Sequence, residues 1–422
     1  MLFSRSLFVC CLLTAGAPLW CQPTVLTIAE AQAEALQNNP GLMAEKLGLP
    51  VADTAVVTAG LKPNPVLSVS SDHLDLLGTG FNATNGAGPS ETALRVDVPL
   101  ERGRKRELRL DNAGYARKIA EAKYADSVRR LRQDVTLACI DLLAAKAKLA
   151  LANDNLQALN KVVQFNETRL QGGAIAPVEL TRARVAMLQY RGNVRTAELA
   201  LLTARTHLET LLGRHPGGTI DIAGDLKVPL PASGPDLREL QTTAQAARPD
   251  IAAVRVDQAR SQSDLRLQIA NGKIDYLVGM EVRRQQGVNG TGNSLGFFFS
   301  APLPVYNRNQ GEIARASREH EQLRQSLEAV QAQVTSDVAG AYEEYESART
   351  LAAEIERDLL EPTKQARDTT AYVYQAGAST LVDVLDAQRA FNDTMSAYYD
   401  ALADYRRASA KLSAAVGQEV IP

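Results

Sequence analysis

Two carboxylates near the C-terminus, Asp383 and Asp386, have the residue type and the spacing that could do chemistry. They stand three residues apart, and in a helix this spacing places both on one face. Carboxylates at a helix start can interact with the positive end of the helix dipole, or they can attract cations from solution. Both interpretations stay open at this point: a solvated helix start, or a cation-attracting pair.

The residues just before this pair predict a turn between two helices. Gly377 can adopt the positive φ that a helix C-terminus often needs. Ser379 or Thr380 can cap the helix that follows, with Asp383 near its positive end. The segment from Tyr374 onward is therefore expected to form the tip of a helical hairpin.

The same tip occurs earlier in the chain, which indicates an internal duplication. An alignment without gaps places Gly173 on Gly377 and Glu179 on Asp383, and it extends as far as Gly213. Each half then reads as helix, β-hairpin, long helix, tip and returning helix. The predicted organisation is a signal peptide at 1–21, a first repeat at 22–213 with a hairpin at 65–100 and a tip near 173, a linker at 214–235, and a second repeat at 236–422 with a hairpin at 274–303 and a tip near 377.

Composition and charge exclude several classes of protein. The chain has 422 residues, of which 45% are hydrophobic and 22% charged, and a formal net charge of −2, which argues against binding to nucleic acid. The four histidines are scattered without metal-ligand spacing, and serine, cysteine and histidine form no nucleophile set. We therefore expect no enzyme, no cofactor and no metal site, and His320, on a helical seam, is expected to be packed or paired.

The N-terminus has the pattern of a secretory signal peptide. A positive residue, Arg5, precedes an apolar stretch, and cleavage is expected before or at Cys21, which is either removed or lipidated. No later apolar run is long enough for a transmembrane helix. The protein is expected to be exported, and Cys139 is the one cysteine well inside the mature chain.

The predicted hairpins have strands with one apolar face. Their side chains alternate with a period of two, and a loop rich in glycine and asparagine is expected at 285–293. The apolar positions expected to face lipid are Leu94, Val96, Val98, Tyr276, Val278, Met280, Leu295, Phe297 and Phe299.

The long helices leave this apolar face uncovered. A near-heptad seam runs from Ile313 to Ile355 for about six heptads and indicates coiled-coil packing between helices. A barrel in a membrane would turn the apolar face of the strands to lipid, and three chains would supply twelve strands. The alternative of an ordinary half-buried sheet in a soluble protein stays open.

The sequence resembles a known family, the TolC-type outer-membrane efflux channels. The most specific motif is Gly-x-x-x-x-Val-Asp-Val-Leu-Asp-Ala, from Gly377 to Ala387. Further similarity lies in the opening helix up to Pro40, in Lys62-Pro63-Asn64-Pro65, and in the Pro-Leu ends of the returning strands. The resemblance implies a homotrimer in the outer membrane of a Gram-negative-type cell, with a shared twelve-stranded barrel and a long periplasmic tunnel of coiled helices that docks on a periplasmic adaptor and an inner-membrane pump.

The resemblance also implies roles for residues at the tips. Asp383 and Asp386 would form acidic rings at a periplasmic constriction, and Gly173 and Gly377 would mark the tips that meet the adaptor. Glu179 and Tyr374 match the acidic and tyrosine positions of the family's gate. Ser379 stands where the family has a basic latch residue, so the charged latch is missing in its usual form.

The function implied is a passive export duct for drugs or heavy-metal ions. Two alternatives stay open: the outer-membrane channel of a type I protein secretion system, and, from another class, a periplasmic coiled-coil scaffold or adaptor.

Overall fold

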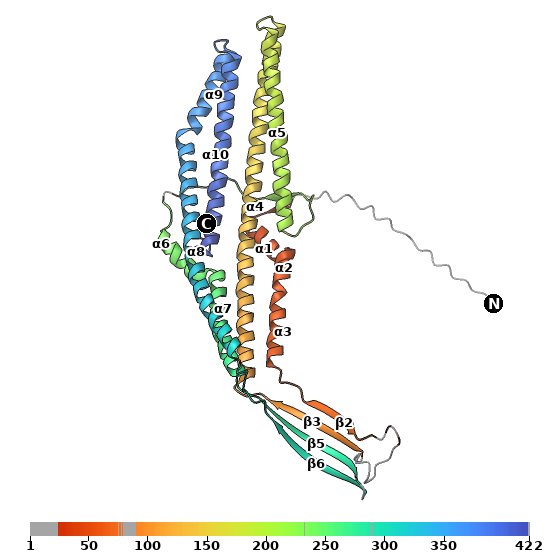
Figure 1. The fold of residues 1–422 in the computed structure, drawn as a ribbon. Coiled ribbons are helices and arrows are strands. Elements are labelled where there is room, and N and C mark those ends of the chain that lie inside the picture. Colours follow the sequence, from red (N-terminus) through yellow and green to blue (C-terminus); the bar gives the residue numbers. More distant parts are fainter. Residues whose placement is uncertain are drawn as a thin grey trace, which may run out of the picture. The chain divides into compact units, whose positions relative to one another are not determined.

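The structure, a computed structural model, describes residues 24–74, 76, 78, 90–231, 233–287 and 290–420. The predicted signal peptide and Cys21 lie outside these residues. Long helices make up most of the fold, together with a four-stranded sheet and a pair of very short strands (Figure 1).

The elements of the first half are β1 (Thr24–Leu26), α1 (Ile28–Asn38), α2 (Pro40–Lys46), α3 (Gly48–Gly60), β2 (Val66–Asp72), β3 (Glu91–Leu100), α4 (Lys105–Gln171) and α5 (Pro177–Leu211). After β4 (Ile220–Ile222), the second half has α6 (Leu237–Ala247), α7 (Pro249–Asn271), β5 (Tyr276–Gly287), β6 (Gly290–Ser300), α8 (Gln310–Asp358), α9 (Leu360–Gln375) and α10 (Leu381–Val416). Within the described residues, no helix is long and apolar enough to cross a membrane.

Local signals determine where several helices begin. Thr27 and Glu30 form a reciprocal capping box at the start of α1. The Asp236 side chain caps α6 by accepting hydrogen bonds from two backbone N–H groups. Pro40 and Pro249 occupy the first positions of α2 and α7, as predicted, because the first turn of a helix needs no N–H from proline.

The chain divides into two compact units, and each combines segments of both halves. The first unit comprises Met1–Asn39, Asp134–Leu230 and Leu351–Asp404. It contains the two helix tips and a core in which residues of α4, α5, α9 and α10 pack together. It also contains β4, which pairs in parallel with β1 and buries Ile220 and Ile222 within the predicted linker.

The second unit comprises Pro40–Gln133, Pro231–Thr350 and Tyr405–Pro422, and it contains the four-stranded sheet. The strand order is β2-β3-β5-β6, and every neighbouring pair is antiparallel. The predicted loop at 285–293 is wrong, because β5 and β6 stay paired as far as Gly287 opposite Gly290. Glycine and asparagine are poor strand formers, but backbone pairing with the neighbouring strand extends the ladder through them.

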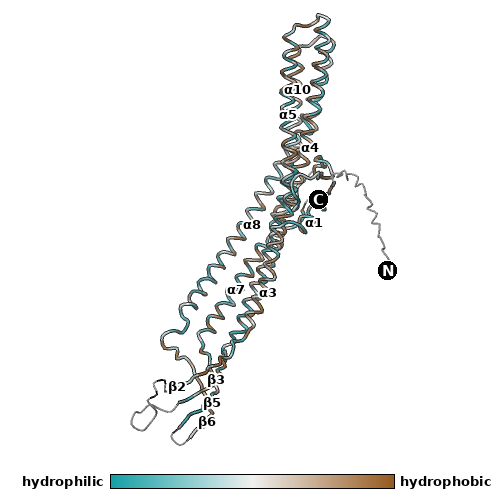
Figure 2. Tube along the Cα trace, turned by 90° about the vertical axis from the view of Figure 1, so that its right-hand side faces the viewer, coloured by the Kyte–Doolittle hydropathy of each residue, from teal (hydrophilic) through white to brown (hydrophobic). Residues whose placement is uncertain are grey.

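Hydrophobic and hydrophilic residues alternate along the long helices (Figure 2). On α8 the predicted seam is buried at Ala316, Val334, Val338 and Tyr345. In this unit the hydroxyl of Ser261 and Nδ1 of His320 lie 2.9 Å apart, so His320 is paired as expected.

Candidate functional site

Both tips end their first helix in the same backbone motif. The N–H of Gly377 donates to the Tyr374 carbonyl and the N–H of Ala378 to the Val373 carbonyl, both at 3.0 Å. At the other tip Gly173 and Ala174 donate in the same way to the carbonyls of residues 170 and 169. The two glycines have φ values of 82° and 70°, as predicted, and this left-handed conformation lets the chain reverse direction in a few residues.

Thr380 caps the helix that follows the second tip, as predicted, and Asp383 bonds back to it in a reciprocal capping box. Its carboxylate accepts hydrogen bonds from the Thr380 hydroxyl at 2.7 Å, the Thr380 N–H at 2.9 Å and the Ser379 hydroxyl at 3.1 Å. Its own N–H donates back to the Thr380 hydroxyl. Three hydrogen bonds lower the pKa of the Asp383 carboxyl below its ordinary value. The largest effect comes from the Thr380 hydroxyl, the next from the Thr380 backbone N–H, and a further one from the Ser379 hydroxyl. Of the five predicted gate residues, these contacts bring Ser379 and Asp383 together.

The other two predicted carboxylates lie on exposed or partly exposed helix surface. Asp386 is exposed and makes an ion pair with Arg389, one turn further along α10, at 3.2 Å. Glu179 is half-buried in the first turn of α5. The single chain therefore presents three carboxylates at the starts of its two returning helices, where they can attract cations.

Tyr374 lies apart from these carboxylates, in the core of the tip bundle. Its hydroxyl donates to the Asn166 side-chain oxygen at 2.5 Å, and Asn166 is 0% exposed. Its ring packs edge-to-face against Phe165, and the Arg169 guanidinium lies over both rings. The hydrogen bond therefore joins α4 to α9, two helices that belong to different hairpins.

Sequence analysis missed Asn166, although a signal was present. A polar amide within the otherwise apolar seam of a long helix predicts a buried partner, since an unpaired amide in a core is costly. The same signal marks Asn155, which accepts from Gln388 at 2.9 Å and donates to Asn392 at 2.6 Å. Asn166 and Asn155 thus both form polar links between α4 and the second hairpin.

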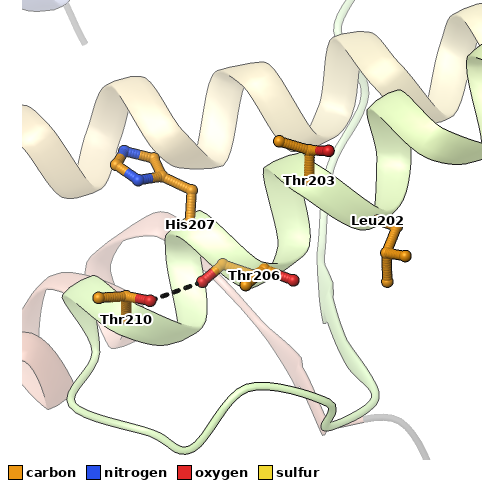
Figure 3. A pocket seen from close by; sticks show the side chains of 5 residues that line it. All are labelled: Leu202, Thr203, Thr206, His207 and Thr210. Carbon is orange, nitrogen blue, oxygen red and sulfur yellow. Dashed lines mark hydrogen bonds between the residues drawn. The ribbon is translucent and has the colours of Figure 1, made fainter.

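Among the hollows of this unit, two lie along the helices of the tip bundle. One of about 410 Å³ lies beside Tyr374, between α4, α9 and α10. The other is a shallow hollow along α5 lined by Thr203, Thr206 and His207 among others (Figure 3). There the hydroxyls of Thr203 and Thr210 donate to carbonyls of their own helix. Among the described residues no group of histidine, cysteine and carboxylate side chains could hold a metal ion.

The sheet presents the predicted apolar residues on one exposed face. Cross-strand pairing aligns Val98, Val278 and Phe299 in one row and Val96, Met280 and Phe297 in the next. Phe297 is 77% exposed. A third row contains Leu94, Val282 and Leu295, and Tyr276 lies beside the first row against Phe299. Leu67 and Val69 of β2 extend this face, and sequence analysis left them out of the predicted set.

The opposite face of the same sheet is charged. Arg95 pairs with Asp97 at 2.8 Å, and Arg283 pairs with Glu281 and with Glu91, each at 2.9 Å. The sheet therefore separates an apolar surface from a polar one, as expected for a wall between lipid and water.

A family model decides the identity of the chain. The model described as "outer membrane efflux protein" matches residues 32–214 and again residues 240–418. The chain belongs to the outer membrane efflux protein family. The resemblance to TolC-type channels is thereby confirmed.

Curated members of the efflux family are similar along most of their length. The cobalt-zinc-cadmium resistance protein CzcC of Cupriavidus metallidurans is 25% identical over 93% of this chain and 90% of its own length. The pyoverdine export outer membrane protein OpmQ of Pseudomonas aeruginosa is 25% identical over 91% of this chain and 82% of its own.

Solved structures of outer-membrane proteins share the fold. The outer-membrane channel OprN superposes with a TM-score of 0.76 at 19% identity, covering 92% of this chain and 89% of its own. The outer membrane protein VceC of Vibrio cholerae gives 0.73 at 17% identity, covering 93% and 96%. The predicted fold class, long helices with a four-stranded sheet as in outer-membrane channels, is confirmed.

Proposed function

We propose that this efflux-family protein is the outer-membrane channel of a tripartite efflux system, a passive duct formed by three copies of the chain. The observation that carries this proposal is the four-stranded sheet, which has an exposed apolar face. Among the described residues its two outer strands, β2 and β6, have no neighbour on one side. In lipid an open sheet edge is costly because its backbone groups have no water to bind. Three chains would close twelve strands, an even number within the range of such barrels.

The acidic tips support a constriction that favours cations. Three copies of Asp383, Asp386 and Glu179 around one axis would concentrate negative charge at the end of the tunnel. The Asp383 cap holds its carboxylate at the helix start, where hydrogen bonds keep it ionised. The tips at Gly173 and Gly377 are proposed to contact a periplasmic adaptor, which links the duct to an inner-membrane pump.

A neutral hydrogen bond is proposed to hold the gate. Ser379 stands where the family has a basic residue, so a charged latch is missing there. The Tyr374–Asn166 hydrogen bond instead joins the two hairpins without formal charge. Separating the hairpins would break this bond in a buried place, which costs more than breaking a solvated contact. Breaking this hydrogen bond should therefore depend weakly on salt concentration, since neither of its partners carries a charge.

Divalent metal ions are the proposed cargo. The similarity to CzcC, named for resistance to cobalt, zinc and cadmium, supports a metal-exporting system. The similarity to OpmQ supports export of a pyoverdine-like chelator as the second candidate. Both agree with a duct whose narrowest part is acidic, because cations or their complexes would have to pass it.

Conductance in planar lipid bilayers tests the duct. The parent protein is compared with the double variant Asp383→Asn and Asp386→Asn. A matched control, Glu198→Gln with Glu361→Gln, removes two carboxylates on α5 and α9 away from the tips. We expect a cation-selective conductance in the parent and the control, and a loss of cation selectivity in the tip variant.

Three results would contradict parts of this proposal. Unchanged selectivity in the tip variant would remove the acidic constriction but keep the duct. Equal loss in the control would assign selectivity to overall charge. A protein that stays soluble without detergent and never inserts would favour a periplasmic scaffold instead.

A further inference from the structure

We propose that Arg102 and Arg104 bind the phosphate of an anionic phospholipid at the end of the sheet where β3 and β5 adjoin the helices (Figure 1). This inference rests on the proposed membrane position of the sheet. It adds a site for a lipid headgroup at the margin of the apolar face of the sheet.

Arg102 is placed at the margin of the apolar face by Tyr276. Its guanidinium lies 4.5 Å from the centroid of the Tyr276 ring and donates to the Tyr276 hydroxyl. The Tyr276 ring in turn lies 5.2 Å from that of Phe299, in the first apolar row. Lipid headgroups begin at the boundary of an apolar belt. A cation held over an aromatic ring at that boundary therefore lies at the level of the headgroups.

The backbone beneath Arg102 is held by a half-buried ion pair. The N–H of Arg102 donates to Asp275 Oδ1 at 2.8 Å, while Lys105 Nζ donates to Asp275 Oδ2 at 2.7 Å and to the Lys273 carbonyl at 2.8 Å. The Lys105 side chain is buried and Asp275 is partly exposed. Both carboxylate oxygens of Asp275 thus already accept hydrogen bonds, one from the Arg102 backbone and one from Lys105. The Arg102 guanidinium makes no ion pair with a carboxylate among the described residues, so it remains available to an anion.

The surrounding surface has the charge and the apolarity that a headgroup site needs. The Arg104 side chain is 81% exposed and forms an ion pair with Glu107, which is itself exposed. The four connections at this end, 61–65, 101–107, 271–275 and 301–310, carry seven lysines and arginines against three carboxylates. They also expose Leu303, Val305 and Tyr306, the last at 92%.

These features favour a lipid phosphate over a free one. A free anion would gain from the charge alone, whereas a phospholipid also brings acyl chains to the adjoining apolar rows. A planar guanidinium matches phosphate oxygens in a two-pronged geometry. Basic residues at an anionic membrane surface contribute about 1 kcal/mol each, which corresponds to roughly a five-fold change in binding.

Native mass spectrometry of the full, detergent-extracted protein tests the site. Phosphatidylglycerol and, separately, phosphatidylcholine are titrated, and bound lipids are counted. We expect the parent to prefer phosphatidylglycerol and Arg102→Gln with Arg104→Gln to lose that preference by about 25-fold. Arg102→Lys should keep most of it, and the control Arg195→Gln, an exposed arginine on α5, should leave it unchanged.

The outcomes separate this site from the duct. Conductance and insertion like the parent, with unchanged lipid preference in the double variant, would overturn the headgroup site and leave the duct standing. Inorganic phosphate that displaces phosphatidylglycerol at equal concentration would also overturn it, by showing a free-anion site. If the double variant fails to insert, Arg102→Lys and Arg102→Gln alone decide, since a charge-dependent preference must differ between them.

Discussion

The buried hydroxyl of Tyr374 joins the two hairpins of the tip bundle through its hydrogen bond to Asn166. The Tyr374→Phe substitution removes this hydroxyl and leaves the buried side-chain oxygen of Asn166 without its hydrogen-bond donor. The side-chain nitrogen of Asn166 has no partner among the described residues, so the whole amide would be unpaired in the core. We expect a loss of about 1–3 kcal/mol in the stability of the bundle. Thermal unfolding of the extracted protein measures this loss, and single-channel recording should show more frequent opening.

Tyr372→Phe is the matched control for that change. Tyr372 lies two residues away on the same helix but is 74% exposed, so losing its hydroxyl should leave both stability and opening unchanged. Equal effects in the two variants would show that the hydroxyl bond to Asn166 has no special role.

The capping carboxylate of Asp383 predicts a pH dependence. Its pKa is lowered by hydrogen bonds from Thr380 and Ser379, so the stabilisation is fully present above the ordinary value of 3.8 and is lost only as the pH falls through the lowered pKa. The difference in melting temperature between the parent and Asp383→Ala should therefore be constant from neutral pH down to the ordinary value and shrink below it. A difference that disappears well above that value would contradict the cap.

At the scale of elements, three helix ends share one motif but differ in their surroundings. Gly213 ends α5 with φ 72° and the same hydrogen bonds as Gly377. A Cβ at Gly377 would meet open space, whereas one at Gly213 would overlap the Asn38 carbonyl of α1. Gly377→Ala should cost about 1–2 kcal/mol from backbone conformation alone, and Gly213→Ala should cost more because α1 must also move.

Denaturant unfolding of the two alanine variants checks this difference. Gly311→Ala is a suitable reference, because this glycine lies within α8 and a Cβ there meets nothing within 4 Å. It should be neutral or slightly stabilising, since alanine is the better helix former. Equal losses at 213 and 377 would mean that α1 adapts without cost.

At the scale of the whole molecule, the sheet is proposed to determine where the protein resides. Phe297→Lys puts a charge in the middle of the apolar face, which costs about 2–4 kcal/mol per chain in a membrane. Ser294→Lys adds the same charge to the opposite, polar face of β6. We expect the first variant to leave the outer-membrane fraction and the second to remain there, as measured by sedimentation and by trimer recovery in mild detergent. Equal partition would contradict a lipid-facing role for the apolar face.

Local and periodic features of this protein could be read from its sequence alone. The starts of α1, α2 and α7 and the turns at Gly173 and Gly377 depend on contacts within a few residues, so the residues themselves specify them. The long helices and the apolar face of the strands follow from periodicity, whereas the family resemblance rested on short motifs, above all the one from Gly377 to Ala387.

Contacts between distant residues were decided only by the tertiary structure. Three of these contacts join positions more than 170 residues apart. They are the pairing of β3 with β5, the hydrogen bond between Tyr374 and Asn166, and the contact of Arg102 with Tyr276. The short strand β4 gave no periodic signal, because three residues are too few to show alternation. Such contacts depend on which helices and strands become neighbours, and no local pattern in the chain specifies that.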